Sequence, residues 1–228
     1  MIKTILWDID GTILNFKAAE SVAIKKCFVE LGIGECTDEQ VARYSKINQK
    51  YWKMLERGKI TKPKLLNERF REFFETEKIN FSDFDEFNKI YQVRLGDTIV
   101  FNDNAYDLIK SFKGKVMQYA VTNGTFTAQD IKLKNSGLYE LFDDVFISEK
   151  IGFEKPDINF FNIVFKKTGI KNLQETVIVG DSLTGDIKGG NNAGILCCWY
   201  NPSNELPPKD LKIDFNIQNL NKLAEIIK

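Results

Sequence analysis

Histidine is absent from the 228 residues of the chain. Its absence excludes Ser-His-Asp and Cys-His triads, histidine-ligated zinc and phosphohistidine chemistry. If the protein is an enzyme, its proton transfers must therefore use carboxylates, lysine, tyrosine, cysteine or water.

Cysteine is scarce, and its spacing does not suit a metal or redox motif. The chain has four cysteines, and none forms a C-x-x-C pair: Cys27, Cys36, Cys197 and Cys198. This spacing excludes zinc-finger sites and thioredoxin-like redox motifs. We expect free, mostly buried thiols in a protein of a reducing compartment.

Net charge and long apolar runs are missing too. The 32 basic residues balance the 32 acidic ones, which argues against nucleic acid or an anionic membrane as the main partner. No apolar run approaches the ~18 residues of a transmembrane helix, and the N-terminus lacks the pattern of a signal peptide. We therefore expect a cytoplasmic protein with a small-molecule partner, either a monomer or a homodimer.

The apolar pattern divides the chain into two kinds of segment. Residues 2–9 predict a short strand, whereas residues 16–95 show the three- and four-residue spacing of helices. Within this helical stretch, Thr37 and Gln40 form a capping box, and Ser82 is placed to cap a further helix.

After residue 96, short apolar runs alternate with helical patterns. The runs at 116–121, 145–147, 176–179 and 195–200 predict strands. Such alternation is typical of an α/β fold with a doubly wound, mostly parallel sheet, similar to a Rossmann fold. We expect residues 1–15 and 96–228 to form this unit, and residues 16–95 to be an all-helical insert after the first strand.

Polar residues gather where the predicted strands end. Asp8 and Asp10 end the first strand, Thr122 the second and Asp181 a later one, so they should meet at one edge of the sheet. Together with Asp186, the aspartates bring four negative charges against the single positive charge of Lys155, an excess of three. Such an all-oxygen set suits Mg²⁺ and a bound phosphoryl group.

Four segments in order carry a family resemblance. Residues 8–12 (DIDGT), 121–124 (VTNG), 155–156 (KP) and 180–186 (GDSLTGD) resemble motifs one to four of the haloacid dehalogenase (HAD) superfamily. The insert resembles the helical C1-type cap of that superfamily. The resemblance implies a Rossmann-like core with a cap, and a Mg²⁺-dependent phosphohydrolase.

The resemblance also implies roles for the motif residues. Asp8 would be the nucleophile that forms an aspartyl-phosphate. Asp10 would act as acid and base, and its backbone carbonyl would contact Mg²⁺. Asp8 and Asp181 would hold Mg²⁺, and Asp186 would complete the metal site by orienting Lys155 or a metal-bound water.

The remaining motif residues would bind the phosphoryl group of the substrate. The resemblance assigns this role to the Thr122 hydroxyl, the Asn123 amide and Lys155, whose charge would also neutralise the nucleophile. Thr12 and Gly124, from the same motifs, are further candidates for substrate contact.

The same residues also bear on alternative activities. Dehalogenases of the superfamily usually lack the second aspartate of motif one, so the presence of Asp10 favours a phosphatase. A receiver domain uses similar groups and would make the chain a phosphorylation-switched binding module, but receivers are about half as long and lack a helical insert. A catalytically silent member of the superfamily is a further alternative.

The insert suggests a substrate. Asn48, Trp52 and Glu56 are four residues apart and share one helix face. They could bind the base of a nucleotide, or Trp52 could pack inside the insert. This stretch resembles the pyrimidine 5′-nucleotidase branch of the superfamily, which implies UMP, dUMP or dTMP as substrates. Phosphoglycolate and sugar phosphates are the alternatives.

Overall fold

A six-stranded parallel sheet forms the centre of the larger unit. The computed structural model describes residues 1–227. The strand order is β3-β2-β1-β4-β5-β6, with every neighbouring pair parallel. The strands are β1 (Thr4–Trp7), β2 (Met117–Thr122), β3 (Asp144–Ile147), β4 (Thr176–Gly180), β5 (Leu196–Tyr200) and β6 (Phe215–Ile217). The predicted doubly wound parallel sheet is confirmed, while the short edge strand β6 was not predicted.

Helices cover both faces of this sheet, which explains why β1 and β4 carry unbroken apolar runs. The helices are α5 (Ala105–Phe112), α6 (Phe126–Asn135), α7 (Ser148–Ile151), α8 (Ile158–Thr168), α9 (Lys188–Ala193) and α10 (Leu223–Ile226). Ile5 and Trp7 of β1 pack in one core cluster with α5 and α10, whereas Leu6 packs in another with α8 and α9. β1 is therefore buried on both sides, and the acidic residues that follow it lie at the middle of the sheet's carboxyl edge.

Four helices between β1 and α5 form a second unit, which we call the cap. They are α1 (Phe16–Glu30), α2 (Asp38–Glu56), α3 (Lys62–Glu77) and α4 (Phe84–Asp97), so the last helix runs two residues beyond the predicted insert. The capping box of Thr37 and Gln40 is confirmed at the start of α2. The predicted cap at Ser82 is wrong, because Asp83 accepts the hydrogen bond from the Glu86 N–H at 3.0 Å.

The cap has an aromatic core of its own. Phe28, Tyr44, Phe70, Phe73, Phe74, Phe87 and Tyr91 are buried together there. The rings stack or meet edge to face, for example Tyr44 and Phe70 at 5.4 Å between centroids. Such pairs stabilise by roughly 0.5–1.5 kcal/mol beyond the area they bury. The aromatic rings of the insert thus pack mainly on one another, and Ala128 of α6 joins the same cluster.

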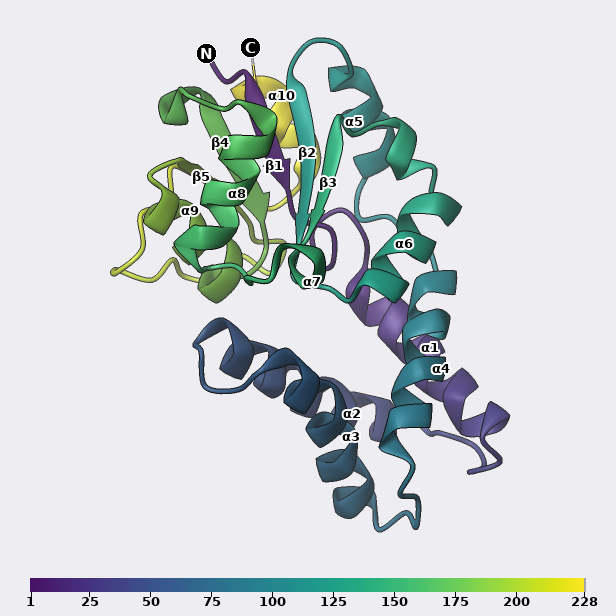
Figure 1. The fold of residues 1–228 in the computed structure, drawn as a ribbon. Helices are drawn as coiled ribbons and strands as arrows, with labels where there is room; N and C mark the ends of the chain where they lie inside the picture. The colour runs from purple at the N-terminus through teal and green to yellow at the C-terminus, as the bar shows by residue number, and fades with distance from the viewer. Residues whose placement is uncertain (228) are drawn as a thin grey trace.

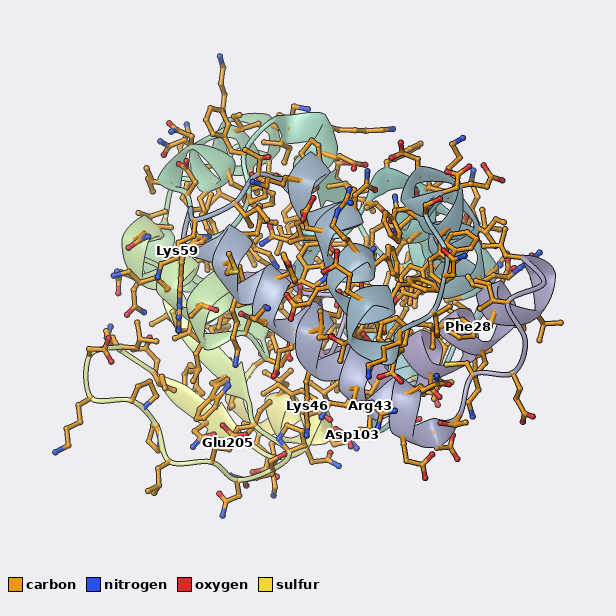
Figure 2. The ribbon with its side chains drawn as sticks, turned by 90° about the horizontal axis from the view of Figure 1, so that it is seen from below. Phe28, Arg43, Lys46, Lys59, Asp103 and Glu205 are labelled. Carbon is orange, nitrogen blue, oxygen red and sulfur yellow. The ribbon has the colours of Figure 1, made fainter. Side chains whose placement is uncertain are left out.

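The cap lies against the carboxyl edge of the sheet, while the N-terminus and α10 lie at the opposite end (Figure 1). Viewed from below, α2 crosses the face of the molecule between Arg43, near its start, and Lys59, in the turn that follows it (Figure 2). No helix in residues 1–227 is long and apolar enough to cross a membrane. The four cysteines are free and buried, as expected.

Candidate active site

Asp8 is the centre of the site, directly beyond the end of β1. Its backbone N–H donates to the Val179 carbonyl at 2.9 Å, which continues the hydrogen bonding between β1 and β4. Only 7% of the residue is exposed. The ammonium group of Lys155 donates to Asp8 Oδ1 at 2.8 Å and to Asp186 Oδ1 at 2.6 Å. Lys155 is itself 2% exposed, so a buried cation joins two of the predicted carboxylates.

Thr12 holds the other oxygen of Asp8. Its hydroxyl donates to Asp8 Oδ2 at 3.0 Å and accepts from the backbone N–H of Asp181 at 3.0 Å. The hydroxyl proposed for substrate contact therefore ties motif one to motif four. Gly11 makes this approach possible, because a Cβ there would lie 2.6 Å from Asp181 Oδ2, and its φ of +95° suits glycine.

The loop after β2 is locked to the Lys155 loop. Asn123 Nδ2 donates to the Lys155 carbonyl at 2.8 Å, and Asn123 Oδ1 accepts from the Lys155 N–H at 2.8 Å. Thr122 is buried, and its hydroxyl accepts from the Gly124 N–H at 3.0 Å. These contacts bring motifs two and three side by side and fix the position of the Lys155 backbone, from which its side chain reaches Asp8.

Asp10 does not join the cluster around Asp8. Its Oδ2 accepts from Gln129 Nε2 at 2.6 Å, and its Oδ1 pairs with the ammonium group of Lys132. Gln129 and Lys132 are fully buried residues of α6. Sequence reasoning did not find them, because two polar residues three apart on a helix resemble a solvated face.

The cap contributes one carboxylate to this edge of the sheet. Glu56, the last residue of α2, accepts from Ser182 Oγ at 3.1 Å and also from the hydroxyl of Thr184. Ser182 and Thr184 come soon after Asp181, where the chain forms a five-residue π-helical turn (Leu183–Ile187). Such π turns occur often at functional sites.

The other two cap candidates lie differently. Asn48 is 1% exposed, its amide donates to Glu20 at 2.6 Å, and its carbonyl accepts from Arg69 at 2.8 Å. Both ends of Asn48 are therefore used inside the cap, which corrects the expectation that it lies on the substrate-facing side. Trp52 is partly exposed, and its buried indole N–H has no acceptor among residues 1–227.

Charge in the site is unbalanced. Five carboxylates, from the four aspartates and Glu56, meet only two ammonium groups, from Lys155 and Lys132, which leaves three negative charges in excess when every carboxylate is ionised. The excess equals the one expected from sequence, although Glu56 and Lys132 were not counted there. A substrate phosphate would add to it.

The crowding appears in the pKa values. Burial, with Asp186 close by, raises the pKa of Asp8 to about 7. Part of Asp181 is accessible to solvent, yet the surrounding protein desolvates its carboxyl and, with Asp8, raises its pKa well above the usual range. Burial alone would lower the pKa of Lys155, but Asp186 and Asp8 outweigh it and raise that pKa. The crowded carboxylates of Asp8 and Asp181 are therefore harder to ionise than ordinary ones, whereas Lys155 stays charged.

A divalent cation fits this donor set. Asp8, Asp181 and Asp186 can each place one carboxylate oxygen within 4.8 Å of the others. An all-oxygen set with excess negative charge suits Mg²⁺ better than the softer metals. The Asp10 side chain is outside this cluster, so only its backbone carbonyl stays a predicted ligand.

Comparison with known proteins identifies the family. The sequence model of the haloacid dehalogenase-like hydrolases matches residues 5–200 of the chain. The chain belongs to the HAD hydrolases. This membership confirms the predicted HAD-type phosphatase at the level of the family and removes the receiver-domain alternative.

Several HAD hydrolases resemble the chain over most of its length. The HAD-hydrolase YfnB of Bacillus subtilis is 36% identical over 225 residues, which are 99% of this chain and 95% of YfnB. The pyrimidine 5′-nucleotidase PynA of Streptococcus pneumoniae is 38% identical over 205 residues, 88% of this chain and 84% of PynA. The pyrimidine 5′-nucleotidase YjjG of Escherichia coli is 25% identical over 98% of this chain and 96% of YjjG.

A solved HAD structure has nearly the same fold. The crystal structure of B. subtilis YfnB bound to magnesium, which reveals interdomain movement, superimposes with a TM-score of 0.93 and covers 100% of this chain and 99% of that one. The L-2-haloacid dehalogenase of Xanthobacter autotrophicus has a TM-score of 0.74 at 15% identity, covers 100% of this chain and 98% of its own, and shares the fold alone.

Proposed function

We propose that this HAD hydrolase is a Mg²⁺-dependent phosphomonoesterase that acts through an aspartyl-phosphate on Asp8. The proposal rests on the burial and the contacts of Asp8. It is buried, its oxygens are held by Lys155 at 2.8 Å and Thr12 at 3.0 Å, and Asp181 lies beside it. A carboxylate aimed and partly neutralised in this way is suited to nucleophilic attack on phosphorus.

Each group has a part in binding. Asp8, Asp181 and Asp186 would hold Mg²⁺, which supplies positive charge to the phosphoryl oxygens when bound. Lys155 donates to Asp8 and would share its charge with the incoming phosphate. Asp186 keeps Lys155 in place, since the two are 2.6 Å apart in a buried pair.

Asp10 would carry the proton. As an Asp8 oxygen bonds to phosphorus, the bond from phosphorus to the leaving oxygen breaks, and Asp10 gives its proton to that oxygen. In the second half, a water oxygen attacks phosphorus, the bond to Asp8 breaks, and Asp10 takes one proton from the water. Asp8 and the protonated Asp10 are restored, and no histidine is needed.

We propose pyrimidine nucleoside 5′-monophosphates as the substrates. The relatives PynA and YjjG support this substrate class. The buried indole N–H of Trp52, which has no acceptor in the described chain, could donate to a carbonyl of the base. Glu56 brings an acceptor to the same end of α2, where it could meet ribose hydroxyls.

The test is a phosphatase screen over nucleotides, phosphoglycolate and sugar phosphates, repeated after exhaustive chelation. We expect UMP or dTMP to be the best substrate, and chelation to abolish turnover until Mg²⁺ is restored. Undiminished turnover without metal would contradict the mechanism. A hexose phosphate or phosphoglycolate that outperforms every pyrimidine nucleotide would overturn the substrate class alone.

Trp52→Ala tests the substrate contact separately. We expect kcat/KM for UMP to fall more than tenfold further than kcat/KM for p-nitrophenyl phosphate, about 1.4 kcal/mol of selective binding, because only the nucleotide uses the indole. Equal losses on both substrates would mean that Trp52 only packs the cap.

A further inference from the structure

Two buried residues of α6 end on the side chain of Asp10, and no HAD motif includes them. Gln129 and Lys132 lie three residues apart, so both point from one face of the helix toward the site. Each is 0% exposed. Each takes one oxygen of Asp10, through Gln129 Nε2 at 2.6 Å on Oδ2 and the Lys132 ammonium group on Oδ1.

Gly124 makes room for this arrangement. A Cβ on Gly124 would lie 2.2 Å from Gln129 Nε2 and 2.8 Å from its amide carbon. Any other residue would push Gln129 away from Asp10. The absence of a side chain at Gly124 therefore lets Gln129 reach Asp10.

The amide of Gln129 can face Asp10 in one orientation only. Once Asp10 has given its proton to the leaving group, its carboxylate can only accept hydrogen bonds, so in the second half-reaction the NH₂ end of the amide must point to Asp10 and the carbonyl end must point elsewhere. Gln129 Oε1 is buried and has no donor among residues 1–227. A buried acceptor without a partner is unfavourable, and such groups are rare. A donor that the chain does not supply should therefore meet it.

We propose that Gln129 is a catalytic residue that orients the hydrolytic water, and that Lys132 is a positioning residue for Asp10. This inference rests on the proposed function, because it assigns the water of the second half-reaction. One hydrogen of the water is donated to Gln129 Oε1 and the other passes to Asp10. The water oxygen bonds to phosphorus, and the bond from phosphorus to Asp8 breaks.

The contacts explain why both residues are needed. The Gln129 amide donates to Asp10 through its NH₂ group and would accept from the water through Oε1. One planar amide therefore sets the distance between the two acceptors of the water, Asp10 and Gln129 Oε1. Lys132 fixes the second oxygen of Asp10 and thus the direction in which the first one faces. A water held by two acceptors has one lone pair aimed at phosphorus, which is the positioning that phosphoryl transfer demands.

Rapid-quench kinetics with p-nitrophenyl phosphate separates the two half-reactions, because its good leaving group needs no acid. We expect Gln129→Leu to keep the initial burst of nitrophenol and to lose about 10- to 100-fold in steady-state turnover, less than the roughly 10²- to 10⁴-fold that a general acid–base group itself contributes. Intact-mass analysis should show the phosphorylated protein accumulating. If the leucine variant does not fold, Gln129→Met, which keeps the side-chain length, replaces it.

Two lysine variants of α6 form the matched pair. Lys132→Met should lower turnover of an alkyl phosphate more than that of p-nitrophenyl phosphate, because the alkyl substrate depends on a well-placed Asp10 in both half-reactions and p-nitrophenyl phosphate only in the second. Lys134→Met should leave both rates unchanged, since Lys134 is exposed and pairs only with Asp130 at 2.6 Å.

The outcomes separate the inference from the proposed function. If Gln129→Leu turns over like the wild type, or loses burst and steady state by the same factor, the inference is overturned and the proposed function stands. If the loss of turnover varied with the leaving group while the rate of dephosphorylation stayed unchanged, Gln129 would act on the substrate. That result would also overturn its proposed role in orienting the water. A wild-type protein without metal-dependent hydrolysis would refute the proposed function itself.

Discussion

The surroundings of Asp8 suit nucleophilic attack but make its ionised carboxylate less stable. Burial beside Asp186 raises its pKa to about 7, from an ordinary value of 3.8. The folded protein therefore binds a proton more tightly than the unfolded chain between pH 4 and pH 7. By linkage, this stabilisation is complete below pH 4 and is lost as the pH rises to 7.

Asp8→Asn should therefore stabilise the metal-free protein at high pH. We expect the free energy of unfolding at pH 8 to rise by roughly 1–3 kcal/mol over the wild type, because an amide needs no counter-charge. At pH 4 the difference should vanish. Urea unfolding at the two pH values measures it, and the same pH dependence in both proteins would contradict the raised pKa.

At the scale of residues, sequence reasoning found the side chains that come directly after strands and missed those inside helices. Asp8, Thr122 and Asp181 were placed because the carboxyl ends of parallel strands meet at one edge. Gln129 and Lys132 gave no such signal, because their burial depends on how α6 packs. Asn48 has the spacing of a ligand contact, but a buried guanidinium and a carboxylate, far apart in sequence, take its amide.

At the scale of elements, a buried chain of hydrogen bonds links every cap helix to the core. From α1 to the start of α6, it passes through Glu20, Asn48, Arg69, Asn88, Gln92 and Thr125. Arg69 is 1% exposed and donates to both Asn48, at 2.8 Å, and Asn88, at 3.0 Å. It therefore connects α2, α3 and α4 at one point.

Arg69→Ala should destabilise the protein far more than a surface arginine would. We expect a loss of about 3–5 kcal/mol, because the change removes a buried charged side chain and leaves the amide oxygens of Asn48 and Asn88 without their donor. Arg71→Ala, two residues along and half-exposed in an i,i+3 pair with Glu68, is the control and should cost under about 1 kcal/mol. Equal losses in thermal or urea unfolding would show that the hydrogen-bond chain adds nothing.

Elements were predictable where local chemistry decides them. The capping box at Thr37 and the strands near β1, β2 and β4 follow from side-chain hydrogen bonding and apolar runs. The three-residue strand β6 forms only because β5 offers it an edge, and the π turn at Leu183–Ile187 has no signal in the local sequence. Tertiary contacts decide both.

At the scale of the whole molecule, polar contacts hold the tip of the cap against the core. Glu56 reaches Ser182 and Thr184, and Lys62 donates to Ser148 at 2.5 Å and pairs with Glu154 at 3.3 Å. A polar junction of this kind can open and close, as lids over active sites do. Closure would bring Trp52 and Glu56 to the leaving group.

Glu56→Ala should weaken this closure. Hydrogen bonds to a charged group contribute about 1.5–3 kcal/mol, so we expect kcat/KM for a nucleotide to fall at least about tenfold. The radius of gyration from X-ray scattering should rise. Lys53→Ala, an exposed change on the same helix, should alter neither. A Glu56→Ala protein as compact and as active as the wild type would mean that the cap closes without this contact.

In the proposed mechanism the phosphoryl group passes through Asp8, and intact-mass analysis detects that intermediate. Wild-type protein, Asp8→Asn and Asp10→Asn are mixed with Mg²⁺ and p-nitrophenyl phosphate and quenched in acid within the first turnover. We predict one added phosphate on the Asp10→Asn protein, mapped to Asp8 by fragmentation, and none on Asp8→Asn. Phosphate on the Asp8→Asn protein, or on any other residue of the wild type, would contradict the assignment.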